Sequence, residues 1–155
     1  MDQIIPHKIF TVCLITHGRK VLLMNRTHDD FSGYIAPGGR VEFFESPVDG
    51  AIREVKEETG LTVRNLKYKG LAEYINPFKP ERYMIFNYIT SEFEGDLLAD
   101  HKEGKAEWIH INALDSIPMQ DSFRRRIPLF FEDGVFEIHT RWKEDRQYDE
   151  YIKRT

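Results

Sequence analysis

The sequence predicts a single domain spanning residues 1–155, an α/β or α+β sandwich in which helices cover a mixed β-sheet. Three observations support this fold class. Several β-rich runs alternate with loops, one segment carries strong start and stop signals for a helix, and no repeat or linker divides the chain. A hydrophobic content of 41% is sufficient for one well-filled core at this length.

The first quarter of the chain contains two predicted strands followed by a long loop. Residues 8–16 and 20–26 are rich in β-branched and aliphatic side chains, and Gly18 lies in the short link between them, as in a hairpin. Residues 28–39 are rich in turn-forming residues and are predicted to be loop, with a short apolar stretch at 34–36.

The segment after this loop predicts a helix with recognisable ends. Ser46 is a favourable N-cap, Pro47 suits the first helical position, and Gly60 can adopt the left-handed conformation that ends a helix. One face of this helix carries the residues expected to pack on a core, namely Val48, Ala51, Ile52, Val55 and Thr59.

The remainder of the chain is predicted to be mainly β-structure. Residues 121–133 are an exception, because they are predicted as a short helix although Pro128 lies within them. The segments with the β-branched and aromatic content of strands are residues 61–75, 82–93, 106–111 and 134–142.

Charge and composition exclude several classes of partner. The net charge is −4, so no overall positive field attracts the chain to DNA or to an anionic membrane. No apolar run has the length of a membrane span, and the first ten residues lack the features of a signal peptide. Cys13 is the only cysteine, which excludes an internal disulfide and favours a reducing, cytoplasmic location.

Three glutamates crowd the polar side of the predicted helix. Glu54, Glu57 and Glu58 share an arc of roughly 100° around the helix axis, where like charges repel one another. Arg53 can pair with Glu57 at i,i+4 but leaves the other two carboxylates unneutralised. One interpretation is a solvated acidic face. The other is a site for Mg²⁺ or Mn²⁺, since these ions prefer hard oxygen ligands.

The spacing of the surrounding residues decides between the two interpretations. The chain follows the pattern Gly-x5-Glu-x7-Arg-Glu-U-x-Glu-Glu-x-Gly-U, in which U is a bulky aliphatic residue. This pattern resembles the signature of the Nudix hydrolases at every fixed position. At the residue frequencies of this chain, a chance match is expected on the order of a few times in a billion windows, which favours the metal site. The matching residues are Gly39, Glu45, Arg53, Glu54, Val55, Glu57, Glu58, Gly60 and Leu61.

The resemblance implies a fold, a reaction and a role for each of these residues. Nudix proteins are α/β/α sandwiches with a mixed sheet, and they cleave a diphosphate bond of a nucleoside diphosphate linked to another group, with Mg²⁺ or Mn²⁺. By this resemblance Glu45 and Arg53 pair with each other and brace the loop. The implied metal ligands are a backbone carbonyl of the Gly38–Gly39 segment, assigned to Gly39, and the carboxylates of Glu54, Glu57 and Glu58, and Gly38 is a candidate substrate contact.

The general base has two candidate positions. Nudix family members use either a glutamate of the helix or one on a distant loop. Residues 101–108, HKEGKAEW, resemble that loop in MutT-type members, which makes Glu103 a candidate ligand for a metal or water. The alternative for Glu103 is an ordinary surface glutamate. The candidate catalytic residues are therefore Glu54, Glu57, Glu58 and Glu103.

Within the family, the chain is most similar to the MutT-like triphosphatases that remove oxidised purine nucleotides. The resemblance lies in residues 101–108, 116–131 and 134–142, and Asp121 is the nearest match to the acidic residues that read the purine edge in those proteins. We therefore expect Mg²⁺-dependent hydrolysis of 8-oxo-dGTP, or of a related nucleotide, to the monophosphate and pyrophosphate.

Other residues are weaker candidates for substrate contacts. Arg26 can reach a phosphate or a base edge, or can be a surface arginine. Phe78 can stack on a base, or can cap the core from its turn. The basic run 124–126 can guide an RNA 5′ end, or can be a solvated helix face. The alternative functions are an RNA 5′-pyrophosphohydrolase, a dinucleotide or nucleotide-sugar diphosphatase, and a non-catalytic nucleotide-binding regulator.

Overall fold

A computed structural model describes residues 3–27, 32–99, 102 and 104–155. These residues form a nine-stranded sheet and a second sheet of two strands. The nine-stranded sheet contains β1 (His7–His17), β2 (Lys20–Arg26), β3 (Gly33–Ile35), β4 (Gly38–Arg40), β6 (Lys67–Asn76), β7 (Glu81–Thr90), β9 (Lys105–His110), β10 (Phe136–Trp142) and β11 (Tyr148–Arg154). The small sheet pairs β5 (Thr62–Arg64) with β8 (Glu92–Glu94).

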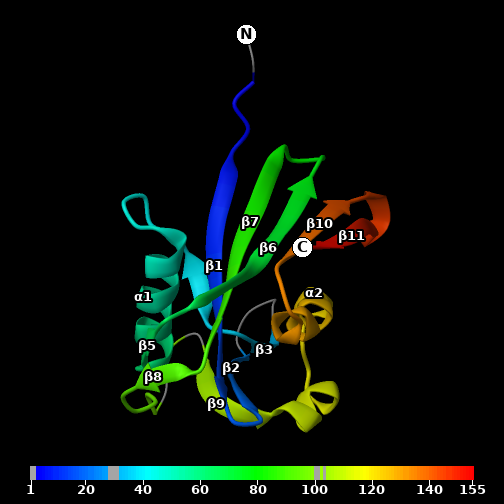
Figure 1. The fold of residues 1–155 in the computed structure, drawn as a ribbon. Helices are drawn as coiled ribbons and strands as arrows, with labels where there is room; N and C mark the ends of the chain where they lie inside the picture. Colours follow the sequence, from blue (N-terminus) through cyan, green and yellow to red (C-terminus); the bar gives the residue numbers. More distant parts are fainter. Residues whose placement is uncertain (1–2, 28–31, 100–101, 103) are drawn as a thin grey trace.

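The large sheet is mixed and lies between two helices. Its strand order is β11-β10-β6-β7-β1-β2-β3, with β4 paired to β1 and β9 paired to β2. β1 runs parallel to β7 and β6 runs parallel to β10, whereas the other pairs are antiparallel. Helix α1 (Pro47–Thr59) covers one face and helix α2 (Asp121–Arg126) covers the other (Figure 1). The α/β/α sandwich implied by the resemblance is therefore confirmed.

Helix α1 begins and ends where its capping residues predict. The hydroxyl of Ser46 accepts a hydrogen bond from the backbone N–H of Asp49 at 3.2 Å, and Gly60 ends the helix with a φ of 86°. Ala51 and Val55 are fully buried against the sheet. No helix in the described ranges is long and apolar enough to cross a membrane.

The two faces of the sheet carry separate apolar clusters. Because side chains alternate along a strand, Cys13 and Ile15 of β1 pack on the α1 side, whereas Val12 and Leu14 pack on the α2 side. The α2 cluster also contains Phe123, which is fully buried. Both helices are thus held against the sheet by apolar burial, and the cluster on each face fixes its helix in place.

The predicted strands 61–75 and 82–93 are each divided in the structure. The first is divided between β5 and β6, and Asn65 takes a positive φ of 55° at the break. The second is divided between β7 and β8, where the hydroxyl of Thr90 donates to the carbonyl of Arg64 at 2.7 Å. In both cases the chain leaves one sheet for the other, a tertiary event that β-propensity does not reveal.

Three further elements differ from the sequence prediction. The predicted helix 121–133 ends at Arg126 and continues as a 3₁₀ helix, η2 (Ile127–Phe131), because Pro128 has no N–H to continue the α-helical pattern. The predicted loop 28–39 contains β3 and the start of β4. Strand β11 was not predicted at all, and two short 3₁₀ helices, η1 (Ile111–Ser116) and η3 (Glu144–Arg146), complete the described elements.

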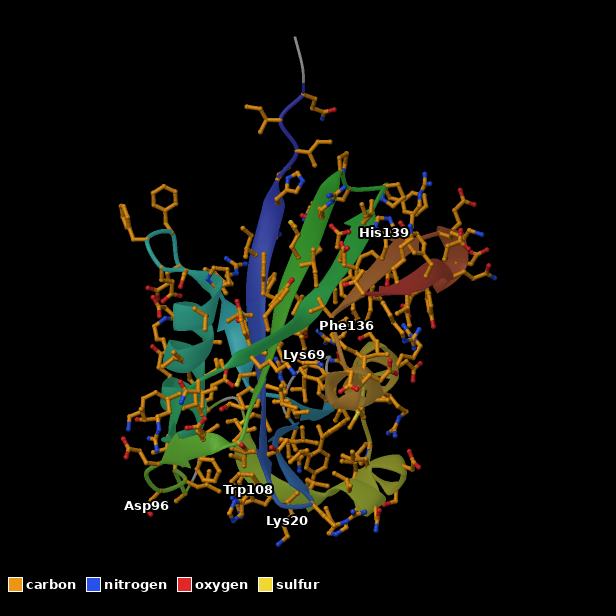
Figure 2. The ribbon with its side chains drawn as sticks, viewed as in Figure 1. Lys20, Lys69, Asp96, Trp108, Phe136 and His139 are labelled. Atoms are coloured by element: carbon orange, nitrogen blue, oxygen red, sulfur yellow. The ribbon has the colours of Figure 1, made fainter. Side chains whose placement is uncertain are left out.

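A buried lysine fastens the α2 segment to the sheet. The Lys69 ammonium donates to the backbone carbonyls of Glu132 at 2.6 Å and Gly134 at 2.8 Å. Figure 2 shows Lys69 close to Phe136, where β6 meets the start of β10. These bonds fix the turn that follows η2, so the helix before it is held at a defined place on the sheet.

Candidate active site

Strand β4 brings a pair of glycines against β1 and the side of α1. Gly38 pairs with Val12 and Gly39 pairs with Thr11. A side chain at position 38 would collide with the carbonyl oxygen of Thr11. A Cβ at position 39 would lie 2.5 Å from the carboxyl carbon of Glu54. Only glycine therefore allows this backbone and this carboxylate to approach so closely.

The three helix glutamates differ in their exposure. Glu58 is 6% exposed, and its carboxylate accepts a hydrogen bond from the N–H of Gly38 at 3.3 Å. The Glu54 side chain is 15% exposed, and burial raises its pKa above the ordinary value, although a hydrogen bond from Arg53 opposes the rise. The Glu57 side chain is 56% exposed. Two carboxylates thus lie inside the site and one lies at its edge.

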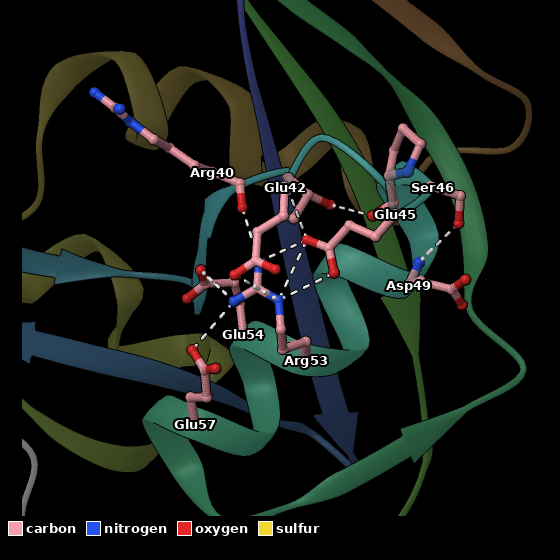
Figure 3. A network of polar contacts seen from close by, with 10 residues as sticks. Arg40, Glu42, Glu45, Ser46, Asp49, Arg53, Glu54 and Glu57 are labelled. Carbon is pink, nitrogen blue, oxygen red and sulfur yellow. Dashed lines mark hydrogen bonds and ion pairs between the residues drawn. The ribbon is translucent and has the colours of Figure 1, made fainter.

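Arg53 is the centre of a network of acidic groups (Figure 3). Its guanidinium binds the Glu45 carboxylate with distances of 2.6 to 3.2 Å, so the predicted ion pair is present. It also lies 3.0 Å from Glu54 and 3.1 Å from Glu57, and it donates to the carbonyl of Arg40 at 2.9 Å. The expectation that Arg53 neutralises only Glu57 on the helix was wrong. Its side chain bends back to the adjacent Glu54, which helical spacing does not suggest.

The glycines and the buried glutamates line one end of a cavity of about 470 Å³. This volume lies in the range of small-molecule sites, roughly 300–1,000 Å³. Arg26, at the end of β2, also lines this cavity. Arg126 lines it too, from helix α2, which covers the face of the sheet opposite α1. Most of the remaining lining, the apolar floor of the cavity, is formed by Phe10, Val12, Met24, Ile35, Ala36 and Ile85. The cavity therefore combines a carboxylate-rich end with an apolar floor.

Comparison with known proteins identifies this arrangement. Residues 6–130 match the NUDIX domain. The chain belongs to the Nudix family. It is 31% identical over 112 residues to an uncharacterized Nudix hydrolase, YvcI, of Bacillus subtilis, with 70% of each chain covered. It is also 31% identical over 134 residues to a protein of that organism named a putative 8-oxo-dGTP diphosphatase, YtkD, covering 86% of this chain and 77% of the relative.

A solved structure extends the Nudix assignment to the whole fold. A MutT mutator protein from Bacillus halodurans superimposes with a TM-score of 0.82 at 25% identity, covering 94% of this chain and 97% of that one. The resemblance that the motif of residues 39–61 suggested is thus confirmed. The chain is a Nudix hydrolase, an enzyme that acts on diphosphate bonds.

The donors at the acidic end of the Nudix site suit magnesium. In the described part of the chain, no three His, Cys, Asp or Glu side chains already form a closed metal cluster. Magnesium does not need one, because it usually takes one or two carboxylates and completes its shell with water and substrate phosphates. Glu54 and Glu58 supply such carboxylates beside the backbone of Gly38 and Gly39. The space that a Cβ at position 39 would fill is occupied by the carboxylate of Glu54.

The structure brings some of the other predicted site residues to the Nudix cavity and not others. Arg26 lines the cavity. Phe78 lies in a separate shallow pocket beside Trp142 and is 61% exposed. Asp121 is exposed at the first turn of α2 and is not part of the cavity lining. Glu103 lies outside the described residues.

The basic run 124–126 is neither a solvated face nor a free basic surface. Arg124 donates to backbone carbonyls of the preceding segment at 2.5 and 3.0 Å. Arg125 forms a two-pronged ion pair with Glu150 of β11 at 2.9 and 3.0 Å. Arg126 is buried in the cavity wall. The sequence does not reveal this inward orientation, because three consecutive charges carry no sign of their partners.

Proposed function

We propose that this Nudix hydrolase is a Mg²⁺-dependent nucleoside triphosphate diphosphatase that releases a nucleoside monophosphate and pyrophosphate. The leading substrates are oxidised purine nucleotides such as 8-oxo-dGTP, whose removal cleanses the nucleotide pool. The single observation that supports this most is the cavity, with buried carboxylates at one end and an apolar floor beyond them. Such a cavity fits a molecule that carries charged phosphates at one end and a planar base at the other. The name of the relative YtkD supports the same substrate class.

Mg²⁺, or Mn²⁺ in its place, would be held by Glu54, Glu57, Glu58 and the backbone of Gly39, and would supply the positive charge that a polyphosphate needs on this acidic surface. The residues of the chain hold this arrangement in place. Arg53 ties the helix to the loop through Glu45, which keeps the glycine pair against the carboxylates.

Proton transfer completes the proposed reaction. The water that attacks phosphorus must lose a proton, and a carboxylate of the helix or Glu103 accepts it. The apolar floor, including Val12 and Met24, excludes water from the base end of the cavity and packs against the planar base. We also place the reaction in the cytoplasm, a location that the lone, buried Cys13 supports.

A substrate panel tests this function directly. The protein is incubated with Mg²⁺ and 8-oxo-dGTP, dGTP, a dinucleotide, a nucleotide sugar or 5′-triphosphorylated RNA, and the products are separated. We expect pyrophosphate and monophosphate, with 8-oxo-dGTP hydrolysed fastest. Glu57→Gln should abolish most of the activity, whereas Glu94→Gln, at an exposed glutamate of β8, should not change it. Release of pyrophosphate from RNA alone, or binding without turnover, would contradict the proposal.

A further inference from the structure

Arg126 is a buried cation that α2 directs into the cavity. It is 3% exposed, and one Nη donates to the side-chain oxygen of Asn87 at 2.9 Å. Its Nε has no hydrogen-bond partner, and no carboxylate of the described residues lies within ion-pair distance of it, although the charge of Glu150 acts on it from farther away. A buried charge that has no direct ion-pair partner lowers the stability of the fold. A group that is retained at such a cost points to a ligand that satisfies it.

The guanidinium of Arg126 is held in one orientation. Asn87 cannot turn its amide, because its NH₂ group donates to the carbonyls of Gly70 at 3.1 Å and Ile85 at 2.9 Å. Its oxygen therefore faces Arg126 permanently. The ring of Phe123 lies below the guanidinium at 5.3 Å. These neighbours orient the cation without neutralising it, so its remaining N–H groups are preorganised donors.

The sheet sets the distance between this cation and the acidic end of the site. Asn87 on β7 pairs with Val12 on β1, and Val12 pairs with Gly38 on β4. Asn87, the residue that Arg126 contacts, therefore lies two strand spacings, roughly 10 Å, from Gly38. Arg126 and the glycine pair line the same cavity. With the phosphates of a nucleotide at the acidic end, the base lies toward Arg126.

A guanidinium donates hydrogen bonds and accepts none, so it selects acceptors. Position 6 of guanine carries a carbonyl oxygen, whereas position 6 of adenine carries an amino group that is itself a donor. Oxidation at C8 leaves the oxygen at position 6 in place. We propose that Arg126 is a specificity-determining residue that binds the carbonyl at position 6 of the purine and so favours guanine-type over adenine-type nucleotides. This inference rests on the proposed function, because it places the phosphates at the acidic end.

Binding of nucleoside monophosphates to the wild-type protein tests the inference without hydrolysis. GMP, IMP and AMP are titrated in turn by calorimetry. IMP and AMP differ at position 6 and in the proton on the adjacent N1, so their ratio reports on the edge of the base that Arg126 is proposed to read. We expect IMP and GMP to bind about 10- to 100-fold more tightly than AMP, the effect of one hydrogen bond to a charged group. Equal affinities for IMP and AMP would overturn the inference.

Arg126→Met assigns the discrimination to this side chain. Methionine fills a similar volume without charge, and thermal unfolding checks that the variant stays folded, because the side-chain oxygen of Asn87 loses its donor. The variant should bind IMP and AMP with nearly equal affinity, through a loss for IMP only. Arg125→Met is the matched control, because Arg125 pairs with Glu150 and does not line the cavity.

The outcomes separate this inference from the proposed function. An equal loss of affinity for both nucleotides in Arg126→Met would indicate a phosphate contact and would refute base selection. Retained discrimination in that variant would refute the role of Arg126. If the substrate panel shows no hydrolysis while IMP is still preferred over AMP in an Arg126-dependent manner, the reaction is wrong and the base selection stands. If hydrolysis occurs and IMP and AMP are bound equally, the proposed reaction stands and the base selection is wrong.

Discussion

Gly39→Ala is the sharpest test of how the backbone and the Nudix helix fit together. The new Cβ would lie 2.5 Å from both the carboxyl carbon and one oxygen of Glu54, whereas ordinary contacts begin at 3.4 Å. The carboxylate must therefore move by about 1 Å. A displacement of this size in a catalytic group costs about 10²-fold in rate, which corresponds to about 2.7 kcal/mol in the barrier.

The fold should survive this substitution. Gly39 is not among the glycines with positive φ, and the atoms that the new Cβ meets belong to a side chain that can turn away. We expect the free energy of unfolding to change by less than about 1 kcal/mol. The rate of pyrophosphate release measures the loss of activity, a Mn²⁺ titration measures the affinity for the metal ion, and thermal unfolding measures the stability.

Gly38→Ala is the matched control for the clash. Its Cβ would meet the backbone of Thr11 and Val12, which cannot move without breaking the pairing of β1 with β4. We expect this variant to lose stability as well as activity. A Gly39→Ala enzyme with the wild-type rate and wild-type Mn²⁺ affinity would refute the reasoning, because the position of Glu54 would then not matter.

Four further outcomes are expected. Glu57→Gln should lower kcat by at least about 10²-fold with little change in melting temperature, measured by kinetics and calorimetry. Chelation by EDTA should stop hydrolysis and added Mg²⁺ should restore it, whereas irreversible loss would argue against a bound divalent ion. Arg53→Met should lower both kcat and melting temperature, because Glu45, Glu54 and Glu57 lose their shared cation. Burial alone would raise the pKa of Glu150, but hydrogen bonds from Arg125 and Thr140, together with the charges of Arg125 and Arg126, hold it below its ordinary value. The stabilisation from this carboxylate is therefore present above the unfolded pKa and is lost as the pH falls through the folded pKa. The melting temperature of Glu150→Gln should thus fall less than that of the wild type between about pH 6 and pH 3.

The parts of the fold that could be predicted have signals that are local in the sequence. Both ends of helix α1 were predicted correctly, because Ser46 and Gly60 act on their immediate neighbours. Strand β11 was missed because six of its seven residues are charged or exposed tyrosine, and its pairing comes from β10. Strands β3 and β4 have three residues each, too few for a recognisable pattern, and they form because β1 and β2 offer edges to pair with.

The same distinction explains what could be predicted of the site. The spacing from Gly39 to Leu61 specifies the acidic end of the cavity, since these residues are close in sequence as well as in space. The other end depends on contacts between distant residues. Arg126 meets Asn87, 39 positions away, and Arg125 meets Glu150, 25 positions away. No periodicity within residues 124–126 indicates which of the three arginines turns inward.

Arg53 gives this acidic surface a counter-ion of its own. Because one guanidinium already holds carboxylates of the loop and the helix together, the surface does not depend on a divalent ion to offset its repulsion. When cellular magnesium falls, we expect the enzyme to stop working yet to stay folded and resistant to proteolysis. Activity can then return as soon as the ion does, without new protein synthesis.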